Sequence, residues 1–171
     1  MAKKIPDLLS GAYKFEVPER YQLLIGKVII EWSRAEQAIE ELIWAYLKLS
    51  IEEGRIITSP LDEKYKISML RGLGIRRSSI GLLKEFHKVI KLLRNLYEHR
   101  STIAHGNWVT LPNGKYAALS LKLKVPEEVD QRRTNAVSYA DDQLTRIITQ
   151  CVMCRNYLID LRNKVSGSPC K

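Results

Sequence analysis

Residues 18–51 read PERYQLLIGKVIIEWSRAEQAIEELIWAYLKLSI, the most regular stretch of the chain. Its apolar side chains recur at alternating steps of four and three, which places them on one stripe of a single long helix. They are Tyr21, Ile25, Val28, Trp32, Ala35, Ile39, Leu42, Tyr46 and Leu49. Pro18 suits the first turn of a helix, and Gly54 lies where the chain can leave it. We therefore expect one helix from Pro18 to about Ile51.

Two further helices are predicted before residue 106. Ser59 and the proline after it suit the cap and first turn of a short helix over residues 59–72. Residues 72–79 are rich in glycine and serine and are read as a connection. A second long helix is then expected over residues 80–105, and Gly106 is placed to end it.

The spacing of the apolar side chains changes after this helix. Residues 108–123 predict a small two-stranded hairpin, because Asn113-Gly114 is a turn signal and apolar residues alternate with polar ones from residue 119. A loop is expected over residues 126–135. Ser138, with Asp141 three residues later, resembles a capping box that opens a last long helix running to about Val165.

These segments together predict an all-α fold, a helical bundle with two long helices and a small β-hairpin inserted before the last long helix. The 171 residues form a single domain, 1–171, with its core over about 18–165. A 30-residue helix spans roughly 45 Å, which is long for a monomer of this size, so part of each stripe is expected to pack against a second chain.

Composition limits the cellular setting. The chain is 45% hydrophobic and 27% charged, and its apolar runs are shorter than the ~18 residues of a membrane span. Its first residues lack the apolar core of a secretory signal. Three cysteines are a poor basis for a disulfide framework. We expect a cytoplasmic protein with no membrane association.

Positive charge is concentrated in one part of the chain. The whole sequence carries a formal charge of +9, and residues 64–105 hold ten basic and two acidic side chains together with all three histidines. Such a block attracts a polyanion such as RNA. The alternative is that these long side chains only solvate a helix face.

Cys151 and Cys154 have the spacing of half a zinc site. The sequence offers no second pair of ligands at zinc spacing, and both cysteines fall on the apolar stripe of the last helix. Core packing is therefore the preferred interpretation, with metal or redox chemistry as the alternative. We expect no metal and no cofactor.

Residues 94–108, RNLYEHRSTIAHGNW, contain two overlapping R-x4-H spacings, Arg94 to His99 and Arg100 to His105. On a helix, steps of four, three and four place Arg94, Glu98, Ser101 and His105 on one polar stripe. This stripe is a candidate phosphate site. The alternative is a solvated face with an Arg94–Glu98 ion pair.

Residues 100–108, RSTIAHGNW, resemble the R-N-x-I-A-H-G-x-W end of the third main helix in HEPN-domain proteins. Trp32 and Glu36 also resemble a W-x-x-x-E segment of that family, and the resemblance extends over about residues 18–165. In the family, an R-x4-6-H motif marks metal-independent endoribonucleases. Ser101 stands where the family has Asn, Asp or His.

The resemblance implies that His105 is a general base on an RNA 2′-OH and that Arg100 stabilises the transition state. The supporting residues would be Ser101, Glu98, Arg94, Asn95 and His99. The substrate-binding residues would be Asn107, Trp108, Lys91, Arg76 and Arg77. No metal would take part.

The family also implies a likeness in assembly and biology. Two such helices meet across a homodimer, so a second His105 would supply the acid in a composite active site. A role as a toxin of a toxin–antitoxin pair or in phage defence, with an antitoxin or defence partner protein, follows by analogy. The alternative function is a non-catalytic HEPN-like module that binds RNA or nucleotide or scaffolds a larger complex.

Overall fold

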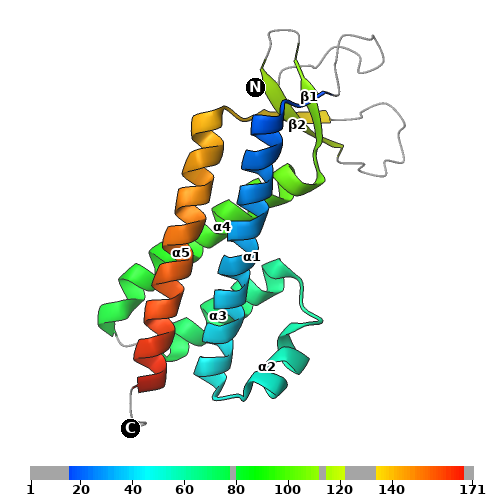
Figure 1. Cartoon of the computed structure of the whole chain (residues 1–171). Coiled ribbons are helices and arrows are strands. Elements are labelled where there is room, and N and C mark those ends of the chain that lie inside the picture. The colour runs from blue at the N-terminus through cyan, green and yellow to red at the C-terminus, as the bar shows by residue number, and fades with distance from the viewer. Residues whose placement is uncertain (1–15, 78–79, 112–114, 122–133, 168–171) are drawn as a thin grey trace, which may run out of the picture.

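The computed structural model describes residues 16–77, 80–111, 115–121 and 134–167. Over these ranges the chain forms five helices and one three-stranded sheet (Figure 1), which confirms the predicted all-α fold with a small hairpin. In chain order they are α1 Glu19–Leu47, α2 Ile51–Thr58, α3 Glu63–Arg77, α4 Ile80–His105, β1 Asn107–Thr110, β2 Tyr116–Leu121, β3 Thr134–Ser138 and α5 Asp141–Gly167. None of the described helices is long and apolar enough to cross a membrane.

Helices α1 and α5 lie side by side and run in the same direction (Figure 1). Ion pairs tie them together along their length, between Arg155 and Glu31 at 3.0 Å and between Arg162 and Glu41. Helices α3 and α4 are antiparallel neighbours, because the first turn of α3 contacts the last turns of α4. The fold thus puts the predicted motif at one end of the α3–α4 pair.

The apolar stripe of α1 forms the centre of the core, as its spacing predicts. Its buried members are Tyr21, Val28, Trp32, Ala35, Ile39, Leu42 and Tyr46, and Ile25 and Leu49 pack against them. Helices α3, α4 and α5 of the same chain cover this stripe. The length of the stripe is therefore no argument for a second chain.

The prediction that the first helix continues to Ile51 was wrong. Helix α1 ends at Leu47, because Lys48 adopts a left-handed conformation with φ 59° and the N–H of Leu49 turns back to the carbonyl of Trp44. Ser50 then opens α2 through a full capping box with Glu53. Gly54 does not end a helix. It lies inside α2, where its missing side chain leaves room for the Trp44 ring.

The short helix and the connection after it were also placed wrongly. Ser59 does not open a helix, and α3 begins at Glu63 after the carboxylate of Asp62 accepts a hydrogen bond from the Tyr65 N–H at 2.8 Å. The helix then continues through residues 72–77, where the sequence predicts a connection between two helices. Gly74 is kept in the helix because the Phe86 ring of α4 packs directly against it.

The boundaries of α4 match the prediction at both ends. The N–H of Gly106 donates to the carbonyl of Thr102 at 2.9 Å, and a side chain at Gly106 would meet that carbonyl and Ala118. Gly106 therefore ends the helix and lets β2 approach it.

The hairpin of β1 and β2 is confirmed, and its turn residues Asn113-Gly114 lie outside the described residues. A third strand, β3, pairs antiparallel with β2. The predicted loop over residues 126–135 was wrong at its end, since β3 begins at Thr134; the rest of that loop lies outside the described residues. The sheet rests on the first turns of α1 through ring contact between Tyr21 and Tyr116 at 4.3 Å.

The predicted capping box of the last helix was wrong. The Ser138 hydroxyl donates to the Tyr116 carbonyl in the sheet, and the N–H of Ala140 donates to the Gln143 side chain at 2.8 Å. Helix α5 begins at Asp141 and continues to Gly167, two residues past the predicted end.

Candidate functional site

The R-x4-H motif occupies the last turns of α4. His105 is the last residue of the helix and its side chain is exposed. Ser101 is half-buried, and Asn107, the first residue of β1, is exposed. His105 is therefore open to a substrate.

Arg100, the other catalytic candidate, is held by α3. Its Nη2 lies 3.0 Å and its Nη1 3.3 Å from the two carboxylate oxygens of Glu63. Both side chains are about one-fifth exposed, at 21% and 17%. The Nε of Arg100 is buried and has no hydrogen-bond partner among the described residues. The planar fork of the guanidinium thus meets a carboxylate of its own chain instead of a phosphate.

His99 of α4 and Trp108 of β1 form an aromatic cluster with Tyr139. The Nδ1 of His99 is 3.3 Å from the Tyr139 hydroxyl, and the Trp108 ring centre is 5.8 Å from that of Tyr139. The indole N–H of Trp108 donates to the Ile103 carbonyl at 3.0 Å. Burial lowers the pKa of His99, which favours its neutral form. These contacts give both residues a structural role in joining α4 to the sheet.

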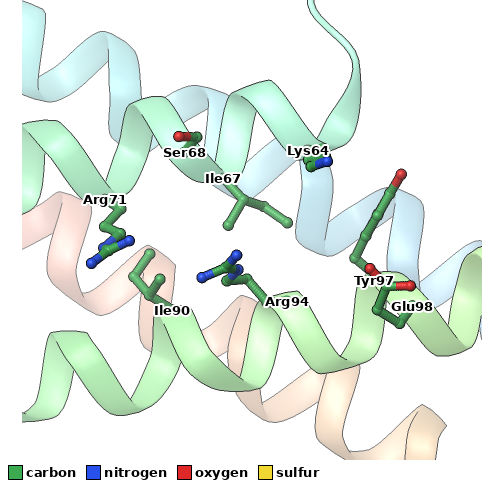
Figure 2. Close-up of a pocket in the computed structure, with 8 residues that line it drawn as sticks. All are labelled: Lys64, Ile67, Ser68, Arg71, Ile90, Arg94, Tyr97 and Glu98. Atoms are coloured by element: carbon green, nitrogen blue, oxygen red, sulfur yellow. The ribbon is translucent and has the colours of Figure 1, made fainter.

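A pocket of about 120 Å³ opens between α3 and α4, beside the motif (Figure 2). Its lining is Lys64, Ile67, Ser68 and Arg71 from α3 and Ile90, Arg94, Tyr97 and Glu98 from α4. Figure 2 shows the guanidinium groups of Arg71 and Arg94 directed into the space between the two helices, one from each helix. Two members of the predicted polar stripe, Arg94 and Glu98, therefore line a cavity together.

The pocket holds three cations and one carboxylate, and it lacks the ion pairs found elsewhere. Among the described residues, Lys64, Arg71 and Arg94 form no ion pair. The alternative prediction of an Arg94–Glu98 ion pair was therefore wrong. Lys66, by contrast, is buried between α1 and α3 and lies 2.7 Å from Glu36 and 2.5 Å from Glu40. Burial alone would lower the pKa of Lys66, but these carboxylates raise it. The chain thus neutralises the lysine that it buries and leaves the pocket positive.

The remaining substrate-binding candidates are dispersed. Lys91 and Asn95 are exposed on α4 but do not line the pocket. Arg76 is exposed near the end of α3, and the Arg77 guanidinium donates to the Tyr46 carbonyl. That end of α3 is roughly 20 Å along the helix from Glu63. The structure does not bring Arg76 or Arg77 to the motif.

The sequence interpretation missed Glu63, Lys64, Ser68 and Arg71. A signal for three of them was present, because Lys64, Ser68 and Arg71 follow one another at steps of four and three and so share a helix face. Which face of α4 this surface meets depends on how the helices pack, and no local pattern contains that information.

The two cysteines of α5 belong to the core. Cys151 and Cys154 are buried, which confirms the packing interpretation. Burial raises the pKa of Cys151 to about 12 and that of Cys154 to about 11. Both thiols stay protonated at neutral pH and are poor nucleophiles.

Comparison of the chain with protein-family models, curated proteins and solved structures finds no significant match. The function is therefore inferred from the residues themselves. They offer an exposed imidazole at the end of α4, an arginine of the same helix whose fork meets Glu63, and a positive pocket along that helix.

Proposed function

We propose that this protein is a metal-independent endoribonuclease of the HEPN type, related to toxin–antitoxin or phage-defence systems. The observation that carries the proposal is the exposed His105 at the end of α4, in a segment that resembles the HEPN motif and adjoins a positive pocket. An exposed imidazole can accept and donate a proton through its ring nitrogens, which suits proton transfer to and from RNA.

In the proposed reaction, His105 accepts the proton of an RNA 2′-OH, and the 2′-oxygen attacks the adjacent phosphorus. The bond from phosphorus to the 5′-oxygen breaks, which leaves a 2′,3′-cyclic phosphate and, once the leaving oxygen is protonated, a 5′-OH. Arg100 would stabilise the negative charge that develops on the phosphate oxygens. To do so it must share or leave its contact with Glu63.

The leaving oxygen needs a proton donor, and one His105 cannot act as base and acid in the same step. The proposal therefore includes a homodimer in which a second, protonated His105 supplies that proton. It also places the protein in the cytoplasm, where RNA is available. An antitoxin or other defence protein that covers α4 would keep the nuclease inactive.

The test is cleavage of a 5′-labelled single-stranded RNA in excess EDTA, with analysis of the product ends. We expect His105→Ala to lower the rate by at least 10²-fold, the lower bound for a lost acid–base group. Arg100→Lys keeps the charge but loses the planar fork, so the rate should also fall sharply. His87→Ala is the matched control, because His87 is also exposed on α4 but lies outside the motif. Equal rates for His105→Ala and His87→Ala would contradict the proposal.

One observation favours a second candidate, a non-catalytic module that binds RNA or scaffolds a complex. The carboxylate of Glu63 already neutralises Arg100 in this conformation. Wild-type protein that binds a 2′-O-methyl RNA but never cuts the unmodified strand would support this function over the first.

A further inference from the structure

We propose that the pocket between α3 and α4 binds one backbone phosphate of a single-stranded RNA, at a subsite separate from Arg100 and His105. This inference rests on the proposed function, since it names how the same protein would hold its substrate. Its evidence is the charge, size and chemistry of the pocket and its place along α4.

The charge of the pocket is arranged to receive an anion. Lys64 and Arg71 of α3 and Arg94 of α4 line the pocket, and among the described residues no carboxylate forms an ion pair with them. Interhelical basic groups elsewhere have such partners, as Arg155 has Glu31 and Arg100 has Glu63. Three positive side chains against the single carboxylate of Glu98 leave the pocket with a net positive charge, which a bound phosphate would neutralise.

The size of the pocket limits what it can hold. Pockets for drug-sized ligands and cofactors measure roughly 300–1,000 Å³, whereas this one measures about 120 Å³. A single phosphate group fits that space, and the sugar and base of its nucleotide would lie at the mouth of the pocket or beyond it. The ligand is therefore better explained as one phosphate of a longer strand whose sugars and bases stay outside.

The donors of the pocket match phosphate oxygens. Arg71 and Arg94 each present a planar fork suited to bidentate contact with phosphate, and Ser68 adds a hydroxyl. Tyr97 also lines the pocket, and Figure 2 shows its hydroxyl directed away from Arg71 and Arg94. Ile67 and Ile90 form an apolar floor that strengthens these polar contacts.

The position of the pocket suits an extended strand. Arg94 precedes His105 by eleven residues of the same helix, which corresponds to about 16 Å along the axis. A strand with its scissile phosphate at His105 and its path along α4 would bring a phosphate a few nucleotides away over this pocket. Glu98 lies on the rim between them and repels the same strand.

The experiment measures binding of a fluorescent 2′-O-methyl single-stranded RNA by anisotropy at several salt concentrations. The 2′-O-methyl groups prevent cleavage, so the result does not depend on the nuclease reaction. The test variant is Arg71→Ala/Arg94→Ala. The matched control is Arg20→Ala/Arg146→Ala, which removes the same charge from exposed positions on α1 and α5.

We expect the test variant to bind at least tenfold more weakly and to lower the slope of log K against log salt by about 0.7, the value for one lost phosphate contact with a single strand. The control should keep the wild-type slope. Arg71→Lys/Arg94→Lys should keep most of the slope but lose affinity, because lysine lacks the fork. Glu98→Gln should tighten binding severalfold.

Two results would overturn the subsite. The first is an equal slope of log K against log salt for the test variant and the control. The second is tight binding of adenosine 5′-monophosphate that displaces RNA from the wild-type protein but not from the test variant, since the ligand of the pocket would then be a free nucleotide. Failure of the nuclease proposal is recorded separately, as absence of cleavage of unmodified RNA by wild-type protein.

Discussion

Glu63 neutralises the charge of Arg100, which the proposed reaction would need for the substrate. The two carboxylate oxygens lie 3.0 Å and 3.3 Å from the guanidinium nitrogens. We expect Glu63→Gln to raise both RNA affinity and cleavage rate severalfold, because the amide cannot neutralise Arg100. A cleavage assay under saturating and subsaturating RNA would separate the two effects.

The control for this prediction is Glu52→Gln, which removes an exposed carboxylate from α2 and should change neither quantity. A Glu63→Gln protein that is folded and has wild-type affinity and rate would show that the ion pair only joins α3 to α4.

His99 should make stability depend on pH. Burial lowers its pKa in the folded protein, so the unfolded chain takes up the proton first as pH falls through about 6.5. The contribution of His99 to the free energy of unfolding is therefore present above that pH, and it is lost as pH falls toward the pKa of His99 in the folded protein. His99→Gln should reduce the drop in urea midpoint between about pH 7.5 and 5.5.

His87→Gln serves as the matched variant, because His87 is exposed on the same helix. It should leave the drop unchanged. An identical drop in His99→Gln and wild type would mean that another group causes the pH dependence.

At the residue scale, the spacing predicted that Arg94 and Glu98 share a helix face, and both line the pocket, whereas it did not predict the partner of Arg100. The first two share a helix face with the pocket, and spacing alone reveals a shared face. The partner of Arg100 is 37 residues away in the chain, so no local pattern could identify Glu63.

At the scale of elements, two glycines of α3 allow the effect of helix propensity on stability to be distinguished from the effect of side-chain packing. Gly74 lies against the Phe86 ring, whereas a side chain at Gly72 would meet nothing within 4 Å. Gly74→Ala should destabilise the protein by about 1–3 kcal/mol, because its methyl group would overlap the ring. Gly72→Ala should stabilise it by about 0.5–1 kcal/mol through helix propensity.

Urea unfolding of both variants at one pH checks this prediction. If the urea midpoint moved in the same direction for both variants, the Phe86 ring would be able to move aside for a methyl group at Gly74. The close approach of α3 and α4 would then not require glycine at this position.

The same glycines explain which element boundaries could be predicted. The ends of α4 follow from local signals and were found. Gly54, Gly72 and Gly74 look like helix ends in the sequence but lie inside helices, two of them against aromatic rings from elsewhere in the chain. Strand β3 was missed because TNAVS has little apolar alternation and depends on pairing with β2.

For the whole molecule, the main prediction is the homodimer. One His105 cannot be both base and acid, so activity should require two chains. Light scattering at micromolar concentration should return twice the chain mass of 19.7 kDa. A monomeric mass in a preparation that cleaves RNA would exclude the composite site and require an acid from within the chain.

The fold class followed from the periods of the apolar stripes, but the arrangement of the helices did not. A stripe shows that a helix is covered on one side and does not show by which partner. The stripe of α1 suggested a second chain, yet α3, α4 and α5 of the same chain cover it. The partner that covers an apolar stripe therefore depends on contacts between distant parts of the chain, which the spacing of apolar residues does not reveal.

The pairing of α1 with α5 has a consequence for synthesis. Helix α1 emerges from the ribosome about ninety residues before α5, an interval of roughly 5–20 s at ordinary translation rates. Until then the side of α1 that α5 covers, including Glu31 and Glu41 with their arginine partners still unmade, has no permanent neighbour. Chaperones that hold apolar segments would bind the nascent chain there. A chain interrupted before residue 141 would keep that surface of α1 exposed to chaperones, and synthesis of α5 would be the step that covers it.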